Sequence, residues 1–489
     1  MGLTIDKEEF TDAEYTAFGE RLDHSLAALR ELLGRPGFGA GPASLGAELE
    51  LFLVDGEERP LPRNDVVLDI ARDDRVVPEL SRFNIELNLT PRELSGRPFE
   101  ALAAEMTETM HLADQAARQC GGHVVPVGVL PTLRPDHLAA PFISDAPRYR
   151  ALSNGLRRLR AEPFEIRIEG QDELAYRADD SAPEGANTSW QVHLRVPPEE
   201  FADCYNAAQL AIAPVLAVSG NSPLLLGRRL WHETRIALFE QSSDERDQIA
   251  RRRRVARVAF GSGWVREGAY ELFEEAVRVH EPVLPVVTGE DPRAVVRAGG
   301  VPELEELRLH QGTVWRWNRA VYDPADGGHL RVEMRALPAG PTVPDMVANA
   351  AFLLGLTLHL RETAPEWTRV LGFQQAHANF YRAARDGLDA VLAWPTAGET
   401  REFPVRELVP ALLPAALESL EKAGAGDALD HLELVRDRLA AGRTGALWQL
   451  QALAALEPGL GREEGARELM ARYRAHSATH RPVHTWPVP

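Results

Sequence analysis

Four separate segments of this chain alternate between apolar and polar side chains, and this pattern constrains the fold more than any other feature. In residues 45–52 every odd position is apolar, whereas Glu48 and Glu50 share the opposite side. Successive side chains of a β-strand point to opposite faces, so these two carboxylates lie about 6.6 Å apart along one face. The segment predicts a strand that packs its odd residues on a core and presents its acidic residues on the other face.

The other three segments, residues 83–90, 189–196 and 330–336, follow the same pattern. Their polar faces carry Asn84, Glu86, Asn88 and Thr90 in the first, Gln191, His193 and Arg195 in the second, and Arg331, Glu333 and Arg335 in the third. A sheet with one solvated face would give the same alternation without any chemistry. Closely spaced carboxylates repel each other unless a cation lies between them, however, and this favours a binding site.

The residue types on these polar faces suit metal ions and phosphate groups. Carboxylates with one imidazole are typical ligands of divalent cations. Arginines beside them would donate charge-assisted hydrogen bonds to phosphate oxygens. We therefore expect the four strands to pair antiparallel and to bring five side chains onto one concave surface: Glu48, Glu50, Glu86, His193 and Glu333.

Lysine is nearly absent, and this excludes several classes of protein. The chain has only Lys7 and Lys422. A P-loop and a protein-kinase fold each require a lysine at a defined position, and Schiff-base chemistry requires one as the nucleophile. A chain without any lysine between residues 7 and 422 fits none of these.

Charge and composition limit the partners further. The net charge of −19 argues against nucleic acid and anionic membrane surfaces as partners. No run of 18 or more apolar residues appears, so we expect no membrane-spanning helix. The first ten residues lack an apolar signal core, and Cys120 and Cys204 form no C-x-x-C motif. We expect a cytoplasmic protein without a disulfide framework.

Helical periodicity appears between and after the four strands. It predicts helices over residues 11–34, 98–120, 148–159, 198–218, 267–279, 342–360, 414–423 and 428–441. Pro414 would occupy the first turn of its helix, where its missing N–H costs nothing. The fold class is α+β, and we expect a catalytic domain over residues 1–380 and a helical C-terminal extension over residues 381–489.

The strand motifs resemble the type 2 glutamate–cysteine ligase family, also called carboxylate–amine ligases. Gly46-Ala-Glu48-Leu-Glu50 is similar to the G-x-E-x-E strand of that family, and residues 79–86 are similar to its second acidic strand. Arg331-Val-Glu333-Met-Arg335 also resembles the Glu-x-Arg strand of glutamine synthetases. The resemblance spans residues 40–360. It implies a glutamine synthetase-type curved antiparallel sheet, with helices packed on one face and the active site on the other.

The resemblance also implies ATP and Mg²⁺ (or Mn²⁺) as cofactors and assigns roles to the matching residues. Glu48, Glu50, Glu86, His193 and Glu333 would bind the metal ions. Arg235 and Arg335 would be the catalytic and cofactor-binding arginines, in contact with phosphate or an acyl phosphate. Arg148, Gln191 and Asn221 would bind substrate. A helix-start surface pair with Tyr149 is the alternative for Arg148, and a helix C-terminal turn is the alternative for Asn221.

The activity implied is ATP-dependent ligation of a small-molecule carboxylate to an amine, with glutamate and cysteine as the best pair. One stretch departs from the family: Trp315 and Trp317 flank Arg316 just before the Glu333 strand. These tryptophans are either aromatic core or a pocket wall that admits a different amine. A phosphotransferase of the same superfamily and a non-catalytic nucleotide- or metal-binding protein are the alternatives. The general base and the oligomeric state stay open, with a homo-oligomer among the arrangements.

Overall fold

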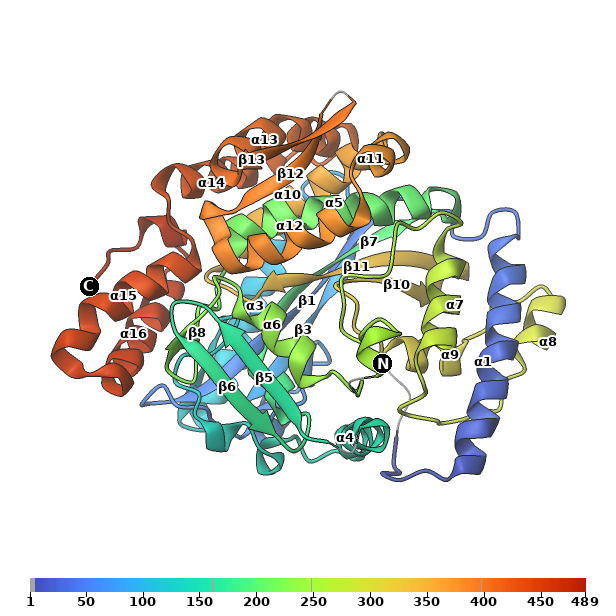
Figure 1. Ribbon diagram of the computed structural model, residues 1–489, viewed down its shortest axis with the longest axis horizontal. Helices are drawn as coiled ribbons and strands as arrows, with labels where there is room; N and C mark the ends of the chain where they lie inside the picture. The colour runs from blue at the N-terminus through green and yellow to red at the C-terminus, as the bar shows by residue number, and fades with distance from the viewer. Residues whose placement is uncertain (1–4, 161, 248, 397) are drawn as a thin grey trace.

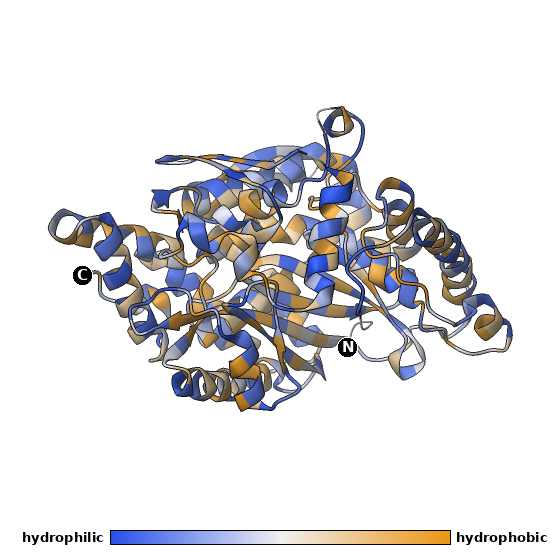
Figure 2. Ribbon diagram, turned by 90° about the horizontal axis from the view of Figure 1, so that it is seen from below, coloured by the Kyte–Doolittle hydropathy of each residue, from blue (hydrophilic) through white to orange (hydrophobic). Residues whose placement is uncertain are grey.

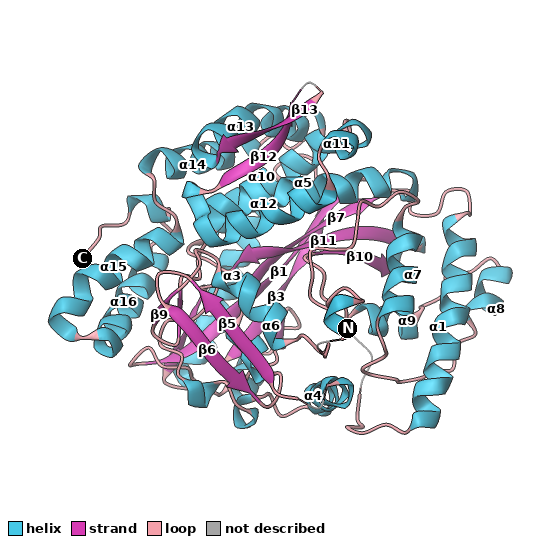
Figure 3. Cartoon of the chain, viewed as in Figure 1, coloured by secondary structure: helices cyan, strands magenta, loops and turns pink. Residues whose placement is uncertain are grey.

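The centre of the molecule is one antiparallel sheet of seven strands (Figures 1 and 3). The structure is a computed structural model that describes residues 5–160, 162–247, 249–396 and 398–489. The strands follow the order β10-β11-β7-β1-β3-β2, and β4 pairs with β1. Their bounds are β1 Ser44–Asp55, β2 Val76–Pro78, β3 Asn84–Glu93, β4 Gly122–Val125, β7 Ser189–Val196, β10 Asn318–Asp323 and β11 His329–Pro338. The four expected strands are thus adjacent (β11-β7-β1-β3) and antiparallel.

Helices cover the apolar face of this sheet. Helix α5 (Phe201–Ser219) and helix α10 (Val343–Arg361) are almost wholly buried in the same core as Leu49 and Val192. The indole Nε1 of Trp190 on β7 donates a hydrogen bond of 2.9 Å to the carbonyl oxygen of Met346 on α10. In Figure 2 the hydrophobic residues concentrate on the central strands and on the helices beside them.

Two segments of the protein, Pro198–Ser219 and Val343–Arg361, are long and apolar enough to cross a membrane. In each case, however, 89% of the most apolar window is buried inside the protein. Their apolar side chains therefore already pack in the core beneath the sheet, as expected for central helices of a large domain.

The remaining elements surround the sheet. The predicted helices in the first 380 residues are present, with ends within three residues of expectation. The other helices before residue 380 are α1 Asp12–Leu33, α2 Asn64–Ala71, α3 Pro98–Gln119, α4 Pro147–Leu159, α6 Thr234–Ser242, α7 Ala269–Val279, α8 Pro292–Arg297, α9 Glu305–Gln311 and α11 Ala364–Val370. Two hairpins lie outside the main sheet: β5 Phe164–Glu169 with β6 Glu173–Ala178, and β8 Leu224–Leu225 with β9 Arg228–Arg229.

The polar face of β1 becomes apolar toward the end of the strand. Phe52 and Val54 belong to a second core, together with Trp448 and Tyr473 from the C-terminal helices. Phe83 packs there too, with its ring centroid 6.0 Å from that of Phe52. The alternation expected over residues 83–90 would put Phe83 on the same face as Ile85. This expectation is wrong, because residue 83 lies in the turn before β3 and not on the strand.

The C-terminal segment packs closely on the rest of the chain. The expected boundary at residue 380 falls inside α12 (Phe373–Asp386), which lies beside α5 (Figure 1). The segment then forms a hairpin, β12 Val391–Thr396 with β13 Glu399–Pro404, and helices α13 Val405–Lys422, α14 Ala428–Ala441, α15 Gly445–Leu460 and α16 Arg462–Ser477. Buried Arg438 on α14 forms an ion pair of 2.8 Å with Asp345 at the start of α10. The tail is therefore anchored to a core helix.

The position predicted for Pro414 is wrong. Helix α13 begins at Val405, so both Pro410 and Pro414 lie inside it. An internal proline removes one backbone hydrogen bond and normally disfavours helix. The apolar face of α13 packs on α10, and this burial offsets the loss.

Candidate functional site

Strand register places the predicted polar side chains opposite one another. Glu50 on β1 pairs with Glu86 on β3, and Glu48 pairs with Gln191 on β7. On the next strand, Glu333 of β11 pairs with His193 of β7. Directly opposite residues share a face of a sheet, so the alternation seen in the sequence becomes one continuous polar surface across four strands.

Glu48, His193 and Glu333 form a first cluster. The Nε2 atom of His193 lies 3.3 Å from Oε1 of Glu48 and 3.8 Å from Oε1 of Glu333. This Nε2 is buried and has no hydrogen-bond partner in the part of the chain that the structure describes. Burial alone would raise the pKa of Glu48, but the neighbouring His193 lowers it below its ordinary value. One potential ligand atom from each residue lies within 4.8 Å of the others, which is close enough for a single ion.

Glu50, Glu79 and Glu86 form a second cluster with the same spacing. Ser189 orients Glu50, because its backbone N–H and its hydroxyl donate hydrogen bonds of 2.7 and 2.8 Å to the carboxylate. Burial and the carboxylate of Glu79 raise the pKa of Glu50 to about 7, and burial with Glu48 raises the pKa of Glu86 well above its ordinary value. Buried carboxylates this close together repel one another, and a cation bound between them would favour their charged forms. Glu79 was not among the predicted ligands because it precedes β3 and lies outside the alternating pattern.

Two arginines hold Glu333. The guanidinium of Arg335 donates a hydrogen bond of 3.0 Å to Glu333 Oε1 and another to the side-chain oxygen of Gln191. Arg319, from the edge strand β10, donates to both oxygens of the same carboxylate. Burial opposes ionisation, but these two arginines keep the pKa of Glu333 well below its ordinary value. Arg319 was not predicted as a site residue, although the register of β10 on β11 places it opposite Glu333.

Arg235, the other predicted catalytic arginine, lies deeper. Its Nε donates to Glu233 Oε1 at 3.1 Å, and its guanidinium also donates to the carbonyl of Ala336. The guanidinium carbon lies 5.6 Å from the ring centroid of Trp317. Arg235 is therefore held by protein groups at the base of the site, with only part of its surface facing the adjoining cavity.

Two cavities of about 380 and about 240 Å³ open on this polar surface. Five residues line both of them: Glu48, Glu86, Arg148, Gly312 and Arg319. The larger cavity continues toward Arg308, Tyr322 and Arg331. The smaller one is lined by Glu50, Glu79, Glu184, Gln191, Arg335 and an aromatic group. Arg148 is exposed at their junction, so it is available to an anionic ligand.

The aromatic group consists of Phe239, Trp315 and Trp317. All three are buried, and all three line the smaller cavity, so the tryptophans are both core and pocket wall. The indole Nε1 of Trp317 donates a hydrogen bond of 2.9 Å to Glu240, which also accepts one from the hydroxyl of Tyr381 on α12. Burial raises the pKa of Glu240 to about 7.

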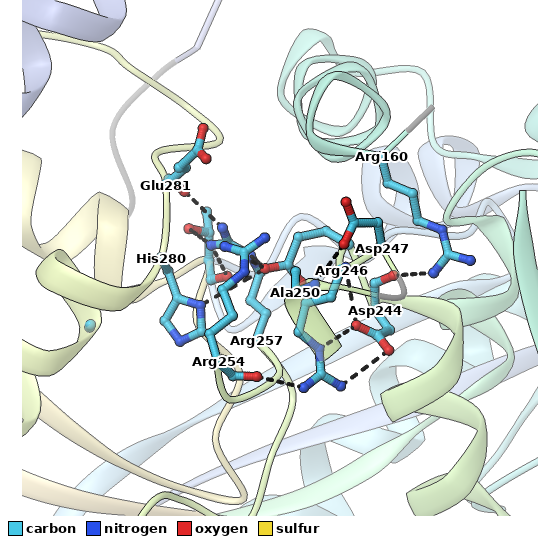
Figure 4. Close-up of polar contacts among 12 residues, drawn as sticks. Arg160, Asp244, Arg246, Asp247, Ala250, Arg254, Arg257, His280 and Glu281 are labelled. Atoms are coloured by element: carbon cyan, nitrogen blue, oxygen red, sulfur yellow. Dashed lines mark hydrogen bonds and ion pairs between the residues drawn. The ribbon is translucent and has the colours of Figure 1, made fainter. Parts of the chain in front are cut away.

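Arg257 lies in a network of charged side chains that includes Arg246, Asp244 and Glu281 (Figure 4). Arg257 donates hydrogen bonds of 3.0 Å to the carbonyl of Thr313 and 2.7 Å to that of Glu281. Close by, Arg246 binds the carboxylate of Asp244 through two nitrogens. Because Arg257 is fully buried, these carbonyl contacts tie the loop before Trp315 to the segment that follows α7.

Asn221 does not reach either cavity, and the substrate-binding role predicted for it is not supported by its position. It is fully buried, and its side-chain nitrogen donates to the carbonyl of Ala339 at 2.6 Å and to the hydroxyl of Tyr473 at 2.9 Å. Its side-chain oxygen accepts from Gln449. The residue follows the end of α5 and joins this helix to the C-terminal helices. This position agrees with the alternative of a helix C-terminal turn.

Comparison with known proteins identifies the family. A sequence model of "Glutamate-cysteine ligase family 2 (GCS2)" matches residues 44–472. The chain belongs to this family. The members are ATP-dependent carboxylate–amine ligases. The GCS2 match extends well past residue 380, into the segment expected to be a separate extension.

One solved structure supports the fold of this GCS2 protein. The glutamate–cysteine ligase of Francisella tularensis in complex with AMP has 12% sequence identity, covers 92% of this chain and 91% of its own, and superposes with a TM-score of 0.56. The fold is α+β of the glutamine synthetase type, with a curved antiparallel sheet and C-terminal helices. A bifunctional glutathione synthetase from Pasteurella multocida has 12% identity, covers 95% of this chain and 55% of its own, and has a TM-score of 0.48. The search of curated proteins found no match.

Proposed function

We propose that this GCS2 protein uses ATP to join a small carboxylate, glutamate in the first instance, to an amine through an acyl phosphate, with cysteine as the reference amine. The observation that carries the proposal is the pair of carboxylate clusters, bordered by arginines, at the junction of two cavities. A nucleotide in one cavity and a carboxylate in the other would meet at that junction.

The side chains fit divalent cations. Each cluster offers three ligand atoms within 4.8 Å of one another, and His193 Nε2 has no protein partner among the residues described. Glu48, His193 and Glu333 would hold one ion, and Glu50, Glu79 and Glu86 another. Mg²⁺ or Mn²⁺ bound there would neutralise charge on the transferring phosphoryl group.

The two cavities suit different substrates. The larger one has Arg308 and Arg331 for phosphates and the ring of Tyr322 on its wall, so we assign it to ATP. The smaller one has carboxyl, amide and aromatic groups, so we assign it to the carboxylate and the amine. Exposed Arg148 lines both and would bind an anionic group at the junction.

The chemistry then takes two steps. A carboxylate oxygen of the substrate attacks the γ-phosphorus of ATP, and ADP leaves. The amine nitrogen attacks the acyl carbon, loses a proton to a protein carboxylate and expels inorganic phosphate. Arg335 and Arg319, which both donate to Glu333 and line the smaller cavity, would stabilise the charge that develops on the phosphoryl oxygens through their planar donors.

The test is a screen for ADP release across pairs of carboxylates and amines, with mass spectrometry of the products and glutamate plus cysteine as the reference. ADP together with an amide supports the proposal. ADP with a phosphorylated product and no amide would instead identify a phosphotransferase. Nucleotide binding without turnover across the panel would identify a non-catalytic binding protein.

A further inference from the structure

One corner of the smaller cavity carries hydrogen-bond acceptors that no donor in the described chain reaches. The atoms are Oδ1 of Asn84, Oε2 of Glu184 and Oδ1 of Asn187, all buried, and all three residues line the cavity. The side-chain nitrogen of Asn84 donates to the carbonyl of Gly185, and that of Asn187 donates to the carbonyl of Glu184, each at 2.7 Å. Because the nitrogens are used, both amides leave their oxygens free.

The chemistry of this acceptor corner (Asn84, Glu184 and Asn187) favours an ammonium group. A protonated amine has three N–H donors and no acceptor, which matches three acceptor oxygens. Glu184 belongs to neither metal cluster, so its carboxyl group stays available when both are filled. Two amides and one carboxyl group also form a weaker cation site than the three-carboxylate cluster beside them. Asn84 is only 2% exposed, and leaving its oxygen unpaired would be costly.

An apolar wall lines the same cavity. The rings of Phe239 and Trp315 have centroids 5.9 Å apart, and each residue is less than 10% exposed. A thiol side chain would cover little of this surface, whereas a hydrocarbon chain or ring would cover much more of it and gain from the burial.

We propose that the amine substrate is a primary ammonium attached to an apolar chain or ring, with its nitrogen on the acceptor corner and its carbon part against Trp315 and Phe239. This proposal rests on the ligase function and replaces cysteine as the preferred amine. The ammonium loses its proton during the second step described above, and nothing else in the chemistry changes.

Turnover with three amines tests the preference. With ATP, Mg²⁺ and glutamate, kcat/KM for 2-phenylethylamine exceeds that for ethylamine by about tenfold or more, since the ring is buried in the first and missing in the second. The kcat/KM for 2-phenylethylamine also exceeds the kcat/KM for cysteine. Trp315→Leu abolishes most of the difference between the two hydrocarbon amines. A preference for cysteine that Trp315→Leu leaves unchanged overturns the proposal.

Glu184→Gln tests the acceptor corner. This substitution raises KM for 2-phenylethylamine about tenfold, because the ion pair that is lost involves only the amine. The KM values for glutamate and for ATP stay within about twofold of wild type. Glu165→Gln, at an exposed position of strand β5, is the matched control and changes none of these constants. If Glu184→Gln raises KM for glutamate instead, the corner binds the ammonium of the carboxylate substrate and the proposal is wrong.

Binding without turnover separates this proposal from the ligase function. Saturation-transfer NMR of 2-phenylethylamine detects binding to the wild-type chain, and Glu184→Gln weakens it. Failure to bind overturns the inference even in an active ligase. Binding without ADP formation from any pair overturns the ligase function instead. Binding of Mn²⁺ alone that Glu184→Gln abolishes would assign the corner to a cation and contradict the inference.

Discussion

The two faces of the central sheet share one backbone but differ in what they contact: one packs on helices, and the other faces the cavity. On β1, Leu49 is fully buried against the helical layer, while its neighbour Glu50 faces the cavity and belongs to a carboxylate cluster. Every polar group on the helical side would need a partner, so that side is apolar. On the cavity side, His193 Nε2 has no hydrogen-bond partner among the residues that the structure describes, and carboxylates lie close together. One face thus supplies stability, and the other concentrates charge that a ligand must balance.

The largest effect is expected from Glu50→Ala. Removal of a metal-binding carboxylate lowers turnover at least about 100-fold, because metal ligands supply several kcal/mol of transition-state stabilisation. Steady-state assays of ADP release with Mg²⁺ or Mn²⁺ measure this loss of turnover. Excess chelator should abolish wild-type turnover, and full activity with chelator would contradict the metal site.

Leu49→Ala is the matched variant on the other face. It should lower the free energy of unfolding by about 2–5 kcal/mol through loss of buried surface and creation of a cavity. Turnover per folded molecule should stay within a few-fold of wild type. If Glu50→Ala lowered the free energy of unfolding as much as Leu49→Ala, the claim that one face supplies stability and the other binds ligands would be wrong.

Arg335→Lys should fold normally and lose most of its turnover, with a smaller loss of ATP binding. Lysine keeps the charge but not the planar guanidinium group, whose Nη1 nitrogen donates to both Glu333 and Gln191. Melting curves and turnover are measured on the same preparation. Arg195→Lys, on the same face of β7 but bound to the carbonyl of Ala40, is the control that stays active. Near-normal turnover of Arg335→Lys with a lower Tm would leave Arg335 only a structural role.

Glu240, behind the aromatic wall, should make stability depend on pH. Burial raises its pKa from 4.5 to about 7, so the folded state keeps the proton over a range where the unfolded state has lost it. The stability of wild type relative to Glu240→Gln is therefore greatest below pH 4.5, falls as pH rises to about 7, and is constant above that. The fall is up to about 3 kcal/mol, since one pKa unit corresponds to about 1.4 kcal/mol. Denaturant titrations at several pH values measure it, and a flat difference would contradict the assigned burial.

Asn221→Ala should have the smallest effect on turnover. It removes hydrogen bonds to Ala339, Tyr473 and Gln449, and leaving these groups unpaired costs about 1–3 kcal/mol of stability. KM values for all substrates should stay within about twofold of wild type. A selective rise in one KM would return Asn221 to the substrate-binding residues.

Alternation in the sequence was sufficient to predict the sheet and the side of each strand that faces the cavity. It could not find site residues that lie off the four strands. Glu79 precedes β3, Glu184 lies in the 3-10 helix Ala182–Ala186, and Arg319 is on an edge strand whose register only pairing reveals. Their contribution depends on which segments meet in space, and spacing along the chain does not contain that information.

The errors have local causes as well. Asn221 follows a helix end, but its side-chain partners include residues 449 and 473, more than 200 positions away. Pro414 suggested a helix start because prolines favour first turns. Packing of α13 on α10 overrides that preference. The tail after residue 380, expected as a helical extension, packs on the core helices and lies mostly within the GCS2 match.

The most direct test of the account follows oxygen from the carboxylate substrate. The wild-type protein is incubated with ATP, Mg²⁺, an amine from the panel and glutamate labelled with ¹⁸O in its side-chain carboxylate, and the inorganic phosphate is analysed by mass spectrometry. Attack of the carboxylate on the γ-phosphorus predicts one ¹⁸O atom in each phosphate released with amide. Amide formation with unlabelled phosphate would contradict the acyl-phosphate mechanism assigned to the polar face of the sheet.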